Sequence, residues 1–209
     1  MRFATFRQKF MDPKPGGWMI EIDDFYLQSS VSYYGLRSYV QHYSQAVQIV
    51  KGVKIDPQQY SSEKLESLLN SCCILYGLLH QRFIATEDGV RHLYRKYQEG
   101  VYGKCPRAAC CGRHLIPTGL SIEIGHSQVL LWCPQCHDLY KPNPEVDIDG
   151  AYFGPDLPIM FHKIAQIPLK FKSFLNIYRK TTDDEGKEIP AIKQRLYRWG
   201  EKKLEAITE

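Results

Sequence analysis

The clearest pattern in the chain is a run of apolar residues at three- and four-residue steps in the stretch SSEKLESLLNSCCILYGLLHQRFIAT. This spacing is typical of a helix with one buried face. Ser61 or Ser62 can cap its start, and Glu63 follows in the first turn, where the helix dipole favours an anion. The stretch predicts a long helix whose buried face comprises Leu65, Leu68, Leu69, Cys72, Tyr76, Leu79 and Phe83.

Three further stretches extend the helical pattern. Thr86 can cap a helix in EDGVRHLYRKYQEG, and Gly100 can end it. Upstream, DDFYLQSSVSYYG and LRSYVQHYSQAVQIVKG predict two more helices. Cys72 and its neighbour Cys73 point about 100° apart on a helix, which suits buried thiols better than ligands of one ion. We therefore expect an all-helical domain over residues 18–100, after an N-terminal arm of residues 1–17.

From Val101 onward, prolines, glycines and cysteines break the helical period, and SQVLLWC alternates like a strand. We expect this second unit to cover residues 101–158. Residues 159–209 then hold two extended-looking runs, LKFKSFLNIYRK and IPAIKQRLYRW, around a predicted turn in TTDDEG. The pattern as a whole predicts an α+β protein with a helical domain, a cysteine-rich ribbon and an extended C-terminal hairpin or tail.

Composition limits the class of protein and the compartment in which it is expected. The chain has 209 residues, of which 44% are hydrophobic and 24% charged, as in ordinary globular proteins. Its longest apolar run is too short to cross a bilayer, and the basic, aromatic start MRFATFRQKFM reads as an arm because it lacks a small-residue cleavage site. Seven cysteines without a secretory signal indicate a reducing compartment, where disulfides are not expected.

The net charge of +4 is unevenly placed. From Met160 to Glu209 there are 11 lysines and arginines against 7 acids, while the preceding 159 residues hold 16 of each. The basic C-terminal segment could meet an acidic partner or nucleic acid, and a solvated tail would look the same.

Two cysteine pairs carry the chemistry: Cys105 with Cys110 in CPRAAC, and Cys133 with Cys136 in CPQC. Pairs of this kind form tight knuckles, and two knuckles supply the four thiolates that tetrahedral zinc prefers. A site filled by four protein ligands is structural, because neither water nor substrate reaches the metal. Zinc binding would then supply about 10–16 kcal/mol of apparent folding free energy. We expect one structural zinc per chain.

The spacing of these cysteines alone does not exclude other functions. CPQCH matches the haem-attachment pattern with His137 as axial ligand, paired knuckles also hold iron, and CPQC could be a redox dithiol. Cys111 is a fifth candidate ligand, and His114 and His126 are further ones. No Walker loop, G-x-G-x-x-G, kinase or G-x-S-x-G motif is present, so a nucleic-acid binder or a protein-interaction module is expected in place of an enzyme.

Several stretches together resemble the regulatory (beta) subunit family of casein kinase II. They are IEIDDFYLQ, HYSQAVQIV, LYGLLHQRFIAT, KYQEGVYGKCPRAACC, LIPTGLS, CPQCHDLYKP, DGAYFGPDLP and QRLYRW, in that order. The resemblance implies a non-catalytic partner of a Ser/Thr kinase, present in cytoplasm and nucleus, that modulates kinase stability and substrate choice. It also implies a homodimer formed through the zinc ribbon, which binds two catalytic (alpha) subunits to give an α2β2 holoenzyme.

Carried onto this chain, the resemblance selects Cys105, Cys110, Cys133 and Cys136 as zinc ligands. It implies kinase docking by Leu196, Tyr197 and Trp199, with Met160 as a further contact. Tyr197 and Trp199 also share one side of an extended chain, as partner anchors or as residues packed on their own domain. Apolar ribbon residues Leu120, Val129 and Leu131 are candidates for the dimer interface or for the ribbon's own core.

The chain also departs from the family pattern. The family begins with an acidic, serine-rich tail, where this chain is basic, and the family's acidic loop corresponds here to the lysine-containing VKGVKIDPQQYSSEK. A response to polyamines is therefore not expected. The alternative function that the residues leave open is a zinc-ribbon nucleic-acid binder that uses the basic tail.

Overall fold

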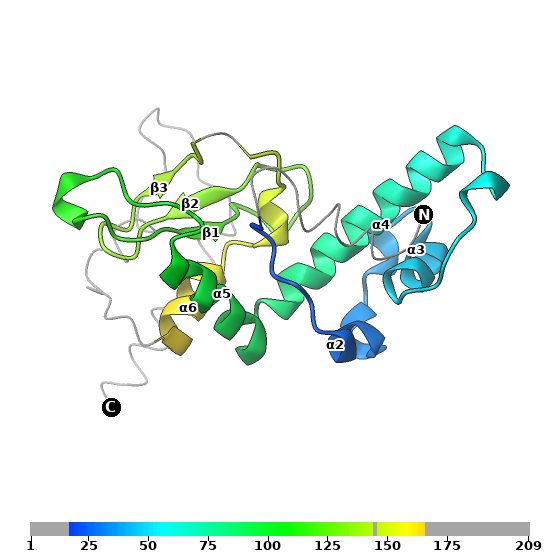
Figure 1. Ribbon diagram of the computed structural model, residues 1–209, viewed down its shortest axis with the longest axis horizontal. Coiled ribbons are helices and arrows are strands. Elements are labelled where there is room, and N and C mark those ends of the chain that lie inside the picture. The colour runs from blue at the N-terminus through cyan, green and yellow to red at the C-terminus, as the bar shows by residue number, and fades with distance from the viewer. Residues whose placement is uncertain (1–16, 144–145, 166–209) are drawn as a thin grey trace.

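The computed structural model describes residues 17–143 and 146–165. Figure 1 shows the helices α2 and α3 at one end of the molecule and a small sheet at the other, with the long helix α4 running between them. Helices α5 and α6 lie under the sheet. Within the described ranges, none of the helices combines the length and apolar character needed to cross a membrane.

Helices α4 (Ser62–Phe83) and α5 (Glu87–Glu99) follow the sequence prediction closely. The Ser61 hydroxyl caps α4 by accepting a hydrogen bond from the backbone of Lys64. Thr86 caps α5 in the same way, and Gly100 ends it in the left-handed conformation at φ 73°. These starts and stops are confirmed because they depend on local capping chemistry.

The two helices predicted upstream are shorter than expected. Helix α2 covers only Asp24–Gln28, helix α3 only Tyr43–Val50, and 3-10 turns at Val31–Tyr33 and Arg37–Tyr39 lie between them. The Ser32 hydroxyl donates to the backbone oxygen of Tyr26 at 2.9 Å. Side-chain bonding of this kind competes with helix propagation, which explains why the predicted helix stops after one turn.

The ribbon region contains a three-stranded antiparallel sheet in the order β1-β2-β3. Strands β1 (Ile116–Thr118) and β2 (Leu130–Trp132) pair with Pro117 opposite Leu131, and β3 (Leu139–Tyr140) pairs with β2 so that Leu139 lies opposite Trp132. The strand expected in SQVLLWC is therefore present as β2.

Helix α6 (Leu157–Ala165) contacts both α5 and β1. Leu157 and Phe161, one helical turn apart, are 2% and 0% exposed. The boundary that the sequence places between residues 158 and 159 falls inside this helix. Residues 159–165 are thus part of the folded body, because the apolar face of α6 is buried against it.

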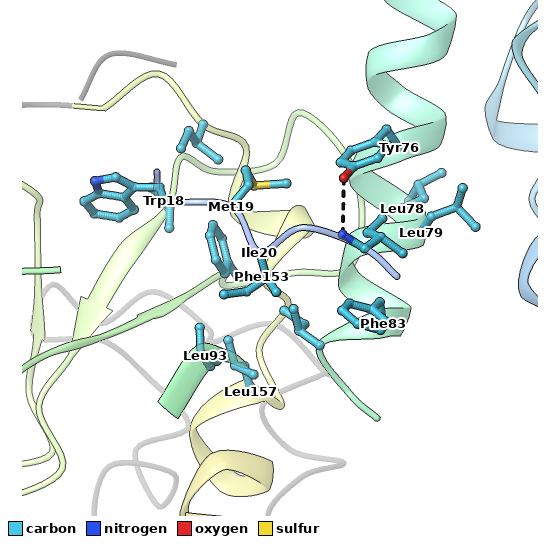
Figure 2. Packing of buried hydrophobic residues seen from close by; sticks show 14 of the residues in the cluster. Trp18, Met19, Ile20, Tyr76, Leu78, Leu79, Phe83, Leu93, Phe153 and Leu157 are labelled. Atoms are coloured by element: carbon cyan, nitrogen blue, oxygen red, sulfur yellow. Dashed lines mark hydrogen bonds between the residues drawn. The ribbon is translucent and has the colours of Figure 1, made fainter. Parts of the chain in front are cut away.

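The helical and ribbon regions share one hydrophobic core, although the sequence pattern treats them as two domains. The segment of residues 18–22 passes between them, and Figure 2 shows Trp18, Met19 and Ile20 among side chains of α4, α5 and the 153–157 segment. The Tyr102 hydroxyl donates to the backbone oxygen of Trp18 at 3.1 Å, and the two rings meet edge to face. The N-terminal segment therefore joins the two regions.

Two residues of α4 fix the chain around residue 152. A Cβ on Gly77 would lie 2.2 Å from a ring carbon of Tyr152, so only glycine permits this close approach. His80 is fully buried, and its Nε2 accepts from the Ile20 backbone at 2.9 Å while its Nδ1 lies 2.8 Å from the Tyr152 backbone oxygen. Only the neutral imidazole with its proton on Nδ1 satisfies both partners.

Candidate metal centre

The four paired cysteines come together beside the sheet. Cys105 follows α5, and Cys110 ends the 3-10 turn Ala108–Cys110. Cys133 comes directly after β2, with Cys136 in the turn that leads to β3. Their Sγ atoms all lie within 4.8 Å of one another. In the described part of the chain, no other cluster of three or more potential metal-ligating side chains was found.

The sulfur geometry fits one tetrahedral metal ion. Zinc–sulfur bonds of about 2.3 Å in a tetrahedron place neighbouring sulfurs about 3.8 Å apart. The Cys105–Cys136 and Cys110–Cys133 Sγ distances are 3.8 and 3.9 Å. A disulfide would need about 2.05 Å, and all seven cysteines are free thiols. Both close pairs join the two knuckles, so one ion would tie residues 105–110 to residues 133–136.

The backbone turns sharply directly after each pair. Cys111 and His137, the residues that follow the second cysteine of each pair, are the described non-glycine residues with positive φ, at 50° and 63°. The His137 amide donates to the Cys133 backbone oxygen at 2.8 Å, and the Gln135 amide donates to the Cys133 sulfur at 3.4 Å. An amide aimed at sulfur stabilises the thiolate, the form that binds metal.

Tyr140 adds a second support for the thiolates. Its hydroxyl lies 3.5 Å from the sulfur of Cys105 and 3.2 Å from that of Cys136. Burial alone would raise the pKa of Cys105, but hydrogen bonds, first of all from Tyr140, lower this pKa to about 7. Burial raises the pKa of Cys133. A cation among the sulfurs, as structural zinc would supply, would favour the thiolate form of the cysteines.

Charged neighbours lie outside the sulfur cluster. Arg107 forms an ion pair with Asp138 at 2.8 Å, with both side chains about half exposed. This pair links the first knuckle to the second across the protein surface. Tyr140 and this ion pair are contacts that sequence reasoning missed, and the only local signal was a tyrosine four residues after Cys136.

The other candidate ligands lie elsewhere. Cys111 is exposed. His114 meets the ring of Tyr97 edge to face, and His126 is exposed. His137 is 1% exposed and stacks on Trp132 with ring centroids 5.6 Å apart. Its ring is therefore part of the ribbon's core packing.

The remaining predicted site residues are scattered. Leu196, Tyr197 and Trp199 lie outside the described residues. Met160 is partly buried in α6 and lines a cavity of about 170 Å³ with Arg82 and Phe153 among others.

The three dimer candidates differ in exposure. Val129 and Leu131 are 1% and 4% exposed within a single chain, so they lie in the ribbon's own core, the alternative that the sequence left open. Leu120 is partly exposed.

The fold and the site together define a class: a helical protein with a closed four-cysteine ribbon. Comparison with known families agrees, since residues 5–189 match the model of the casein kinase II regulatory subunit. The chain is 36% identical over 158 residues to casein kinase II subunit beta of Schizosaccharomyces pombe, covering 74% of this chain and 67% of that protein. It is 34% identical over 155 residues to subunit beta' of Drosophila melanogaster, covering 73% and 70%. It is 37% identical over 140 residues to subunit beta of Dictyostelium discoideum, covering 66% and 52%.

The chain therefore belongs to the casein kinase II regulatory subunit family. This confirms the resemblance seen in the sequence motifs and the expected class, a regulatory subunit of casein kinase II. The chain spans 59% of the length of casein kinase II subunit beta-2 of Schizosaccharomyces pombe.

Proposed function

We propose that this chain is a non-catalytic regulatory subunit that binds a casein kinase II catalytic subunit and is built around one structural zinc ion. The observation that carries the proposal is the closed thiol cage. Its four sulfurs come from two knuckles at tetrahedral spacing, three of the cysteines are buried, and membership of a regulatory-subunit family supplies the context. A cage of this kind shapes a surface and leaves no position for substrate.

The zinc part of the proposal rests on the donor set. Thiolates are preferred by zinc, and Cys105, Cys110, Cys133 and Cys136 would hold it, with Tyr140 and the Gln135 amide bonded to the sulfurs. Bound zinc would supply the charge that lets buried thiols ionise. A reducing location in cytoplasm and nucleus belongs to the same proposal, since free thiols persist there.

The second part of the proposal is a homodimer formed through the ribbon. In the described part of the ribbon, the large apolar side chains that face solvent are Ile122 and Leu139, at 50% and 39% exposure. Leu139 lies on β3, an edge strand of the sheet, and edge strands readily pair with another chain. Leu139→Glu should therefore shift a dimer to monomer in analytical ultracentrifugation, whereas Ile74→Glu in α4 should act through unfolding alone.

The third part is kinase docking through the C-terminal segment. Tyr197 and Trp199 are two positions apart, so they would project to the same side of an extended strand as paired aromatic anchors. Met160 on α6 is partly exposed and would extend this surface onto the folded body.

A pull-down with a casein kinase II catalytic subunit tests the docking. The chain as it stands should capture the kinase, and Tyr197→Ala combined with Trp199→Ala should reduce capture about 100-fold, since aromatic anchors dominate such interfaces. Phe174→Ala combined with Tyr178→Ala serves as the matched control in the same segment and should retain capture. Equal capture by both double variants would contradict the docking assignment.

Salt dependence separates this function from nucleic-acid binding by the basic tail. Binding to phosphates falls steeply with ionic strength, because it releases counterions. Kinase capture through aromatic anchors should change little between 50 and 200 mM salt, on the order of a few-fold. Tight DNA or RNA binding that weakens about 1000-fold over this range, without kinase capture, would favour the alternative.

A further inference from the structure

The four clustered cysteines are not equally shielded from solvent. Three of them are buried, because Cys105, Cys110 and Cys133 are 6%, 3% and 0% exposed. Cys136 is only partly buried, and it lies in the turn between β2 and β3 beside the exposed Gln135. Reagents from solution reach an exposed sulfur more readily than a buried one. Cys136 is therefore the accessible member of the group.

Tyr140 contacts this accessible sulfur from β3. Its hydroxyl lies 3.2 Å from the Sγ of Cys136 and 3.5 Å from the Sγ of Cys105, so one hydroxyl meets one cysteine of each knuckle. The backbone of Tyr140 is held in place because it lies opposite Leu131 in the pairing of β3 with β2. With the sulfurs present as thiolates, the hydroxyl is the donor and the sulfurs are the acceptors.

A charged pair also lies beside Cys136. Arg107 in the first knuckle forms an ion pair at 2.8 Å with Asp138, which follows the second knuckle. The sulfur of Cys136, and after it the carboxylate of Asp138, raises the pKa of the Arg107 guanidinium. A nearby acceptor or negative charge favours the charged form of arginine, so this direction places the guanidinium near the sulfur. Arg107 is thus held between Asp138 and the accessible thiol.

The two other sulfurs depend on different contacts. The Sγ atoms of Cys110 and Cys133 lie 3.9 Å apart, and the backbone amide of Gln135 donates to the Cys133 sulfur at 3.4 Å. A backbone donor stays in place when a side chain is replaced. Substitution of the tyrosine or the arginine described above therefore acts selectively on the accessible half of the group.

We propose that Cys136 is the ligand through which zinc leaves this group, and that Tyr140 and Arg107 are positioning residues that slow the loss. The inference rests on the zinc part of the proposed function. When the bond from Cys136 to the metal breaks, the sulfur keeps the electron pair and can take up a proton or react with an electrophile. The Tyr140 hydroxyl and the Arg107 guanidinium oppose that step, because they hold the sulfur in its place beside the other three.

Transfer of zinc from the zinc-loaded chain to the colorimetric chelator pyridylazoresorcinol tests the two positioning residues. Tyr140→Phe should speed the transfer about ten-fold, since partners behind metal ligands commonly change metal binding by such a factor. Arg107→Gln should speed it about three-fold, because an exposed ion pair is weaker. Arg113→Gln is the matched control and should leave the rate unchanged. This exposed ribbon arginine donates to the side-chain oxygen of Gln135, at 3.4 Å.

Cobalt(II) in place of zinc gives a readout that a change in folding alone would not move. Tyr140→Phe should shift the thiolate-to-cobalt charge-transfer band to lower energy, because a hydrogen bond no longer stabilises the sulfur electrons. Arg113→Gln should keep the parent band. All rates are compared at one protein concentration, and sedimentation measures the oligomeric state of each variant, since Tyr140 lies on the strand of the proposed dimer contact.

Alkylation identifies the ligand that leaves first. Cys111→Ser removes the exposed thiol outside the set of four. In this background, iodoacetamide should modify Cys136 before the other three ligands and in step with zinc release, as mass spectrometry of peptides would show. Modification of one of the three buried ligands first would overturn the inference.

The remaining outcomes also decide the matter. Unchanged zinc transfer in Tyr140→Phe and Arg107→Gln would overturn the role of these side chains. Faster transfer with an unchanged cobalt band, or with a changed oligomeric state, would overturn it too, because the effect would then come from folding or from the interface. All of these results leave one zinc per chain. A parent chain that binds no zinc would instead contradict the proposed function itself, and this inference with it.

Discussion

In the helical region, α4 has 22 residues and buries Leu68, Leu75 and Leu79 along one face. In the ribbon, the strands are three, three and two residues long, and four cysteines gather beside them. The first region can be held by apolar burial, at about 25 cal/mol per Å². Strands this short supply little burial or backbone pairing of their own. With zinc bound as proposed, the ribbon would be held by its ligand as well as by the shared core, whereas the helical region is held by packing alone.

The largest effect is expected from a substitution that removes one of the four cysteine sulfurs. Cys133→Ser should abolish stoichiometric zinc binding and unfold the ribbon, because about 10–16 kcal/mol of apparent metal-binding free energy is at stake. Elemental analysis and the near-UV circular dichroism of Trp132, which adjoins Cys133, would report the loss.

Cys111→Ser is the matched control for this experiment. Cys111 directly follows Cys110, one of the four proposed ligands, but is exposed, so its replacement should keep one zinc per chain and the same spectrum. A Cys133→Ser protein with a native ribbon, or one that retains full zinc, would show that packing alone holds the ribbon.

A smaller effect is expected from the core of the helical region. Leu75→Ala should destabilise the protein by about 2–5 kcal/mol, because Leu75 is fully buried and its truncation leaves a cavity. Chemical denaturation measures the loss, and zinc content of the folded protein should stay at one per chain. Leu65→Ala, at a partly exposed position of the same helix, should cost clearly less. Loss of zinc from folded Leu75→Ala would contradict the division into two modes of stabilisation.

The junction between the two regions should respond to pH. Burial lowers the pKa of His80 to about 4, well below its unfolded value near 6.5. Between these two pH values the unfolded chain binds the proton and the folded chain does not, so stability falls as the pH drops from about 6.5 to 4. The full loss is about 3 kcal/mol. The charged group of another element that acts on this ring is Lys96 of α5, which also disfavours protonation.

His80→Gln isolates this contribution from other groups that titrate in acid. The variant should be less stable at pH 7, because the bonds to Ile20 and Tyr152 are disturbed, but its stability should vary less between pH 6.5 and 4. Denaturation of both proteins across this range, with zinc content checked at each pH, measures the difference. Parallel stability profiles for parent and variant would rule out the proposed role of His80.

Much of the fold follows from local signals. The limits of α4 and α5 depend on Ser61, Thr86 and Gly100, whose effects act within one helical turn. The set of four clustered cysteines could also be predicted from the sequence, because local turns bring the two cysteines of each pair together. Helix α6 was not predicted, because its apolar face is stabilised by contacts with α5 and β1, which are distant in the sequence.

By itself the sequence determined the long helices, their caps and the set of four thiols, since each depends on residues close together in the chain. Only the tertiary structure decided that residues 18–22 join helices and ribbon in one core, that His137 packs on Trp132, and that Val129 and Leu131 are already buried within one chain. The physical reason is that burial is decided by surfaces that meet from distant parts of the chain. A local pattern shows that a side chain is apolar, and the fold determines what covers it.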